Sequence, residues 1–165
     1  MAKKGKKGQK NEYTEDGIKI LAVNRKARFN YTVDESLECG IELVGTEVKS
    51  LRNGQFSFSD SYAIVNNLEL FLIQLHITPY DHGNIHNHEP DRRRKLLAHK
   101  QEIKRLSRKV DEKGFTLIPM KVYLKNSKIK VELGICRGKN VQDKRHTIRD
   151  RDEKRAVARE FRQRI

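Results

Sequence analysis

Apolar and polar residues alternate along much of the middle of the chain with a period of two, which is typical of strands with one buried face. The segments that show this pattern are 27–33, 39–43, 56–64, 68–72, 118–124 and 129–135. Two of the joins between them read as tight turns, Asn66-Asn67 and Lys125 to Lys128, because Asn tolerates a positive φ. We therefore predict two hairpins. The stretch 71–77 fits no single alternation, so it is either a strand buried on both faces or one interrupted by a bulge.

Two segments change to helical spacing. In 46–52, Val48 and Leu51 share a face, Thr46 can cap the start, and Gly54 follows the end. Over 92–110 the apolar residues keep a helical period while basic residues fill the other faces, which predicts one long helix.

This pattern predicts a mainly β fold with a few helices. About six short antiparallel strands do not fit a parallel α/β fold, in which strands alternate with helices. We expect a small closed or nearly closed antiparallel barrel of the OB type, with one long and one or two short helices.

Charge divides the chain into three parts. The chain has 36 Lys and Arg against 22 Asp and Glu, a net charge of +14 over 165 residues. Residues 1–10 contribute +5 and residues 137–165 contribute +6, which leaves only +3 for the middle. We predict a disordered basic arm over 1–12, a barrel over 13–138 and a basic tail over 139–165. A polyanion such as RNA is the natural partner of such a chain.

The tail has one thin apolar stripe, formed by Val157, Phe161 and Ile165. A single stripe is too weak to hold an isolated helix in water. Two interpretations stay open: the tail folds on its target, or it is a solvated charged segment.

Other compartments and scaffolds are disfavoured. No apolar run reaches the roughly 18 residues that a membrane span needs, and the basic N-terminus has no hydrophobic stretch behind it. Cys39 and Cys136 lie far apart without a CxxC motif, so neither a disulfide framework nor a zinc ribbon is indicated. We expect a cytoplasmic protein that is neither secreted nor attached to a membrane.

Basic residues on several of these elements suggest a phosphate-binding surface. They are Arg28, with Asn30 beside it, Lys49 and Arg52 on the short helix, and the cluster Arg92-Arg93-Arg94-Lys95. Tyr80 and Phe161 are candidates for stacking on an unpaired base, although packing in the core or tail is the more common use of such residues.

No catalytic or metal motif is evident. His76, His82, His86 and His88 gather in one segment, but zinc prefers four well-spaced ligands, and a polar loop is the simpler interpretation. Asp60 and Glu69 are too few for a metal-dependent nuclease site, and no P-loop, GxSxG or GxGxxG motif occurs. We expect a protein that is not an enzyme and holds no cofactor or metal.

Five local strings resemble the bacterial small protein B family, the SsrA-binding proteins that act with transfer-messenger RNA. These strings are NRKARFNY at 24–31, GIELVGTEVKSLRNG at 40–54, DSYAIV at 60–65, RRRKLLAHKQEI at 92–103 and GKNVQDKR at 138–145. The resemblance covers about residues 18–145 and also implies an OB-like barrel.

The resemblance implies a function that composition does not. Family members bind the tRNA-like domain of transfer-messenger RNA and, with elongation factor Tu, help deliver it to stalled ribosomes for trans-translation. Carried over residue by residue, it implies RNA contacts at Asn24, Glu38, Leu97 and Lys139. Glu38 would accept a hydrogen bond from a base or orient a basic neighbour. In the same matched motifs, further phosphate or sugar contacts are expected at Lys49, Arg52, Arg94, Lys95 and His99.

For the tail, the resemblance implies contacts with the decoding region of the ribosome. Asp143, Lys144 and Arg145 form its root, and the tail becomes helical in the empty mRNA path. Many family members carry a Trp or another bulky apolar residue there, whereas this chain offers Ile148, Val157 and Phe161. We expect the protein to be a monomer. The alternative function is that of a generic basic ribosomal or tRNA-binding protein, and an RNA-processing hydrolase is disfavoured.

Overall fold

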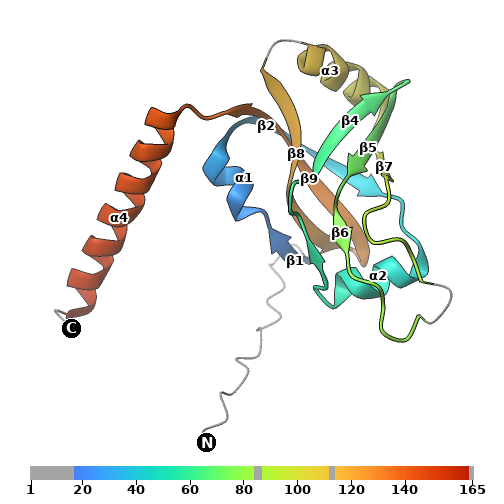
Figure 1. Ribbon diagram of the computed structural model, residues 1–165, viewed down its shortest axis with the longest axis horizontal. Coiled ribbons are helices and arrows are strands. Elements are labelled where there is room, and N and C mark those ends of the chain that lie inside the picture. Colours follow the sequence, from blue (N-terminus) through green and yellow to red (C-terminus); the bar gives the residue numbers. More distant parts are fainter. Residues whose placement is uncertain (1–16, 84–86, 112–113, 164–165) are drawn as a thin grey trace, which may run out of the picture.

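The structure, a computed structural model, describes residues 17–83, 87–111 and 114–163 (Figure 1). Its elements in chain order are β1 (Ile18–Val23), α1 (Arg25–Asn30), β2 (Tyr31–Ile41), α2 (Gly45–Arg52), β3 (Phe56–Ser57), β4 (Tyr62–Asn66), β5 (Glu69–Ile73), β6 (His76–Ile77), β7 (Arg94–Leu97), α3 (Lys100–Asp111), β8 (Phe115–Lys125), β9 (Lys128–Gly138) and α4 (Val141–Gln163). The arm predicted to be disordered, 1–12, lies outside the described residues.

One antiparallel sheet closes on itself. Its strands run in the order β1-β8-β4-β5-β7-β2-β9, and β8 also pairs with β9 from Phe115 opposite Arg137 to Lys125 opposite Lys128. The strands β8, β4, β5, β7, β2 and β9 therefore form a ring, and a closed ring removes the open edges at which sheets aggregate. The predicted mainly β, barrel-like fold is confirmed.

Both predicted hairpins are present. Asn67 and Leu68, with φ of 50° and 59°, join β4 to β5, and Asn126 and Ser127, with φ of 49° and 63°, join β8 to β9. Two consecutive residues with positive φ make the tight turn whose twist matches the flanking strands. The short strands β3 and β6 pair separately from the barrel.

The prediction of a strand over 27–33 is wrong for its first half. Residues 25–30 form helix α1, because the side chain of Asn24 accepts a hydrogen bond from the Ala27 N–H at 2.9 Å and caps the first turn. The strand begins only at Tyr31. In so short a helix, the apolar residues can mimic an alternation with a period of two.

The prediction of one helix over 92–110 is also wrong at its start. Residues 94–97 form strand β7 between β5 and β2, and helix α3 begins at Lys100. Arg94 and Leu96 point into the core, whereas Lys95 and Leu97 point outward, which is strand alternation. Leu96 fitted the helical stripe by coincidence.

The ambiguous stretch 71–77 is two strands. Gln74 has φ of 56° and separates β5 from β6, so the chain changes direction there and leaves the barrel sheet. The predicted short helix at 46–52 is present as α2, but it begins at Gly45 and its cap differs from the prediction. The Glu47 side chain accepts the Val44 N–H at 2.8 Å, and Thr46 instead contacts His88.

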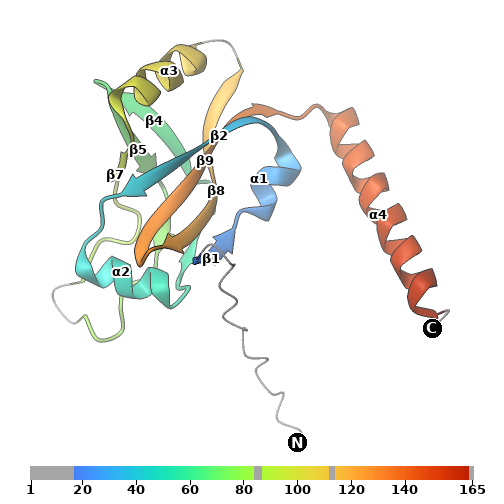
Figure 2. The ribbon, with the colours of Figure 1, turned by 180° about the vertical axis from the view of Figure 1, so that it is seen from behind.

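The core fills the barrel and is covered at its ends. Its fully buried residues include Leu51, Leu70, Leu72, Leu96, Leu106, Leu117, Val131 and Leu133. Helix α3 covers one end of the barrel and α2 the other, while α4 extends away from it (Figures 1 and 2). No helix in the described ranges is long and apolar enough to cross a membrane. Cys39 and Cys136 are free thiols in the core, and burial raises their pKa values to about 12 and about 11.

Candidate nucleic-acid interface

Glu38 is the centre of a charged cluster on the barrel surface. Its carboxylate accepts the Tyr123 hydroxyl at 2.6 Å and the Lys125 ammonium at 3.0 Å, and Lys130 lies 3.9 Å away. The hydrogen bond from Tyr123 and the one from Lys125 lower the pKa of Glu38, so it is a carboxylate at neutral pH. Burial and the bond to Glu38 raise the pKa of Tyr123, which stays a phenol. Of the two roles expected for Glu38, the structure favours orienting basic neighbours.

Sequence reasoning missed Tyr123, Lys125 and Lys130. The alternation along the predicted β8–β9 hairpin could have identified them. Tyr123 and Lys125 share one face of β8, and Tyr123 pairs with Lys130 across the β8–β9 hairpin.

Helix α2 carries two further exposed basic side chains, of which Arg52 lies at the same hairpin. Arg52 is exposed and donates to the Ser127 carbonyl in the β8–β9 turn at 3.3 Å. Lys49 is exposed and lies 5.1 Å from the centre of the Tyr80 ring, a cation–π contact. Both side chains are exposed, and a phosphate contact at either of them stays a prediction.

Leu97 is an exposed apolar residue beside the β8–β9 hairpin. Its side chain is 52% exposed and contributes to two hollows, one lined by β2 and the start of β9, the other by the β4–β5 turn and α3. Gly40 faces it, where a Cβ would come within 3.2 Å of the Leu97 Cβ. A small residue at 40 therefore lets Leu97 lie flat against β2. An exposed leucine between basic side chains can pack against a ribose or base.

Arg94 is not a phosphate contact in this structure. Its guanidinium is fully buried, donates to Glu47 at 2.8 Å, and also donates to the carbonyls of Leu75 and Pro90. Arg92 donates to both carboxylate oxygens of Glu47, at 2.8 Å to Oε1 and 2.6 Å to Oε2. This expectation fails because strand alternation turns Arg94 inward. Lys95 points outward, with a 38% exposed side chain, and pairs with Glu69.

Glu47 is the buried anion that holds these two arginines. Burial alone would raise its pKa, but the hydrogen bonds from Arg92, from the Val44 N–H and from Arg94 bring the pKa below its ordinary value of 4.5. The network joins α2 to the segment that leads into β7.

Asn24 also has a structural role. It is 6% exposed; its Oδ1 caps α1, and its Nδ2 donates to the Pro119 carbonyl at 3.0 Å. These two bonds hold α1 on β8, and an RNA contact at Asn24 stays a prediction.

Arg28 and Lys139 meet at the junction between α1 and the tail. Arg28 is exposed near the end of α1, and its carbonyl accepts the Lys139 ammonium at 3.3 Å. The Lys139 N–H donates to the Asn30 carbonyl at 2.9 Å. Figures 1 and 2 place this junction at the side of the barrel and α2 at one end, so Arg28 and Lys139 lie apart from Lys49 and Arg52.

The histidines that the structure describes in this part of the chain have separate partners. His88 is buried between Thr46 and the Ile77 carbonyl, His76 pairs with Asp91 at 3.0 Å, and His99 is exposed just before α3. His82 contacts Tyr80 edge to face. His86 lies outside the described residues. Among the residues that the structure describes, no group of three His, Cys, Asp or Glu is placed to hold a metal ion.

The tail forms helix α4. Asp143 accepts the Asn140 N–H at 3.3 Å near its start, and Lys144 and Arg145 follow in the first turns. The side chains of Ile148 and Val157 are 40% and 52% exposed. Phe161 lies on the helix, but its side chain is outside the described part. Exposed apolar residues on a projecting basic helix are free to contact a partner.

The fold and these surfaces define a class of protein: a small basic β-barrel with exposed basic side chains, as in nucleic-acid-binding proteins, and a helical basic tail. The profile of the SmpB protein family matches residues 21–163. The chain therefore belongs to the SmpB family.

Known relatives are similar over most of their length. The SsrA-binding protein of Desulfitobacterium hafniense (strain DSM 10664 / DCB-2) is 53% identical over 147 residues, which cover 89% of this chain and 94% of that one. The SsrA-binding protein of Caldicellulosiruptor saccharolyticus is 55% identical over 138 residues, 84% of this chain and 87% of that one. A chain from a solved structure described as "tmRNA-SmpB: a journey to the center of the bacterial ribosome" aligns with a TM-score of 0.63 and 48% identity, covering 73% of this chain and 85% of that chain.

Proposed function

We propose that this protein is a non-enzymatic adaptor that binds the tRNA-like domain of transfer-messenger RNA and promotes its delivery to stalled ribosomes for trans-translation. The observation that carries the proposal is the family match over 21–163, together with relatives named SsrA-binding proteins. The description of the similar solved structure names tmRNA, SmpB and the ribosome together.

The barrel surface supports an RNA contact by its charges. Glu38 fixes Lys125 and Lys130 in place, so less side-chain entropy is lost when the two ammonium groups meet phosphates. Arg52 and Lys49 extend the same positive surface along α2, and Leu97 adds an apolar contact. Phosphate contacts give affinity and position, while the directional groups around Glu38 favour one RNA over another.

The tail supports a separate contact with the ribosome. A basic helix that projects from the barrel can follow an RNA-lined path and neutralise the phosphates that flank absent mRNA. Asp143, Lys144 and Arg145 lie at its root, and Ile148 and Val157 offer apolar contacts further along. We propose that the tail orders fully only there, since an isolated helix with little tertiary packing is marginal in water. In this proposal the protein acts as a monomer in the cytoplasm, and elongation factor Tu joins through the RNA.

A binding titration tests the RNA preference. The full chain is titrated with the tRNA-like fragment of transfer-messenger RNA and with an elongator tRNA at several salt concentrations. The proposal predicts a preference for the fragment that survives moderate salt. Equal binding that collapses as salt rises would instead indicate a generic basic ribosomal or tRNA-binding protein.

A further inference from the structure

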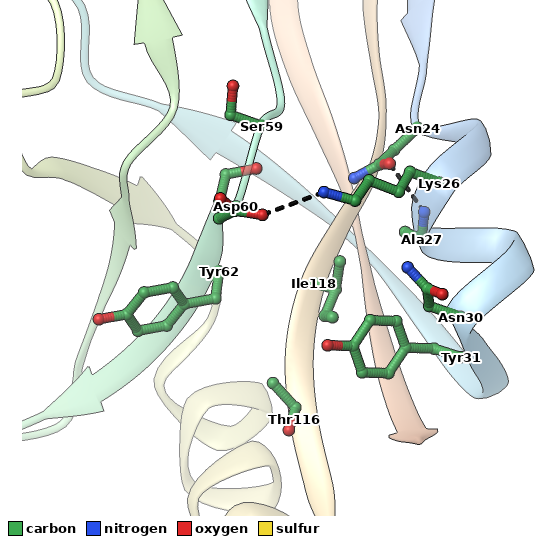
Figure 3. Close-up of a pocket in the computed structure, with 11 residues that line it drawn as sticks. Asn24, Lys26, Ala27, Asn30, Tyr31, Ser59, Asp60, Tyr62, Thr116 and Ile118 are labelled. Atoms are coloured by element: carbon green, nitrogen blue, oxygen red, sulfur yellow. Dashed lines mark hydrogen bonds and ion pairs between the residues drawn. The ribbon is translucent and has the colours of Figure 1, made fainter. Parts of the chain in front are cut away.

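A pocket of about 290 Å³ lies between α1, the loop before β4, and strand β8 (Figure 3). Its lining includes the apolar side chains of Ala27 and Ile118. Tyr31 and Tyr62, which also line it, come from different strands; Figure 3 shows the Tyr31 ring beside Ile118 and the Tyr62 ring directed away from both. The pocket is separate from the Glu38 cluster, and Asn24, at which the family resemblance implies an RNA contact, also lines it.

Polar groups surround this apolar lining. They are Asn30, Ser59, Asp60, Lys26 and Thr116. The Lys26 ammonium lies 3.2 Å from the Asp60 carboxylate, which joins α1 to the loop before β4 (Figure 3). Ser59 in that loop has φ of 33°, an uncommon conformation held by a hydrogen bond from its N–H to the Ser57 hydroxyl. Strained loop residues cluster at ligand sites.

We propose that this pocket receives one unpaired nucleobase of an RNA. A base has two flat π faces that stack on aromatic rings and a polar edge that needs hydrogen bonds, and the pocket offers tyrosine rings, an amide and hydroxyl groups. The volume is near the lower end of the range for small-ligand sites, roughly 300–1,000 Å³, which suits a single ring system and excludes a duplex. The inference rests on the proposed RNA-binding function and adds a specific subsite to it.

The surroundings favour RNA as the source of the ligand. Arg25, Lys26 and Arg28 are exposed on α1, so the backbone that carries the base would run along a basic helix. The Lys26 and Asp60 side chains are 70% and 84% exposed, and such an ion pair contributes little stability, so Lys26 can turn to a phosphate at small cost. Lys139 is tied to Asn30 at the edge of the same region.

The test uses the full chain and two RNA hairpins of equal length. One carries a single bulged 2-aminopurine, a fluorescent base, and the other is fully paired. We expect the protein to prefer the bulged hairpin and to quench its fluorescence at saturation. Tyr62→Thr removes the ring but keeps strand propensity, and should reduce the preference about tenfold, the loss typical of one stacked base. Tyr62→Phe keeps the ring and should retain the preference.

Val33→Ala is the matched control, because Val33 is 39% exposed and Tyr62 is 38% exposed. It should leave the preference unchanged. Equal binding of the two hairpins by the wild-type chain, or a Tyr62→Thr variant that keeps the preference and the quenching, would overturn the inference.

A second arm separates this inference from the proposed function and identifies the RNA. The Tyr62→Thr variant is titrated with the tRNA-like fragment of transfer-messenger RNA. If the affinity of the variant for this fragment falls in parallel with the bulge preference, the base that enters the pocket comes from transfer-messenger RNA. If the affinity for the fragment is unchanged and the bulge preference is lost, the base comes from another RNA, such as ribosomal RNA. Failure of the wild-type chain to prefer the fragment over an elongator tRNA would count against the proposed function, whatever the hairpins show.

Discussion

Arg94 and Lys95 are adjacent residues on β7 with opposite roles, so substituting each by Met separates structure from binding. Arg94 is fully buried in the network with Glu47 and Arg92 and also donates to the carbonyls of Leu75 and Pro90. Breaking a buried ion pair by removing one partner costs about 3–5 kcal/mol. Because Glu47 keeps Arg92, we expect the lower part of this range for Arg94→Met.

That loss is large beside the whole stability of a small domain, about 5–15 kcal/mol. At about 2–4 °C per kcal/mol, a loss of about 3 kcal/mol should lower the Tm of Arg94→Met by roughly 6–12 °C. The Lys95 side chain is partly exposed and pairs with Glu69, so Lys95→Met should leave the free energy of unfolding nearly unchanged.

Urea unfolding followed by circular dichroism measures the stability of both variants, and RNA titration below the transition measures their affinity. Arg94→Met should be destabilised with near-normal affinity when folded, whereas Lys95→Met should be stable with weaker, less salt-sensitive binding. An Arg94→Met variant of wild-type stability that loses RNA binding would refute the reasoning.

Three further predictions concern other parts of the chain. Because the pKa of Glu47 in the folded protein lies below its ordinary value of 4.5, the free energy of unfolding should fall as the pH drops below about 4.5 and through the lower folded pKa. Urea unfolding at several pH values should show a weaker pH dependence for Glu47→Gln, and an unchanged pH dependence would argue against the network. Glu38→Gln should weaken binding of the tRNA-like fragment about threefold to tenfold while leaving non-specific RNA binding unchanged or stronger, and an equal change for both RNAs would count against its orienting role. Truncation after Lys139 should retain most binding of the tRNA-like fragment and abolish activity on stalled ribosomes, and amide exchange of the free chain should be fast over 146–163. Loss of RNA binding together with ribosome activity, or strong amide protection over 146–163, would contradict a tail that orders on the ribosome.

The sequence was sufficient to predict the barrel and its two hairpins. Alternation along β8 and β9 is long and regular, and Asn67 and Asn126 sit where the turns require positive φ. The errors lie in short segments. Segments as short as 25–30 and 94–97 cannot show whether the apolar period is that of a helix or that of a strand. The Asn24 cap makes 25–30 a helix, and pairing within the sheet makes 94–97 a strand.

The candidate site could be predicted only in part, because a sequence does not say which way a charged side chain points. Arg94 and Lys95 look alike in a basic run, yet one is buried and the other is exposed. Asn24 matched the family motif, but its amide is used to cap α1. The pocket at Tyr31 and Tyr62 joins strands that are distant in sequence, so only the closed barrel reveals it.

The most direct test of the central claim is a reconstituted translation reaction with ribosomes halted at the end of an mRNA that lacks a stop codon. Transfer-messenger RNA and elongation factor Tu are supplied, with or without the full chain, and the product is assayed for the added tag. The account predicts that tagging depends on the full chain and is lost when the chain ends at Lys139. Equal tagging without the protein, or no tagging although it binds the RNA tightly, would contradict the account.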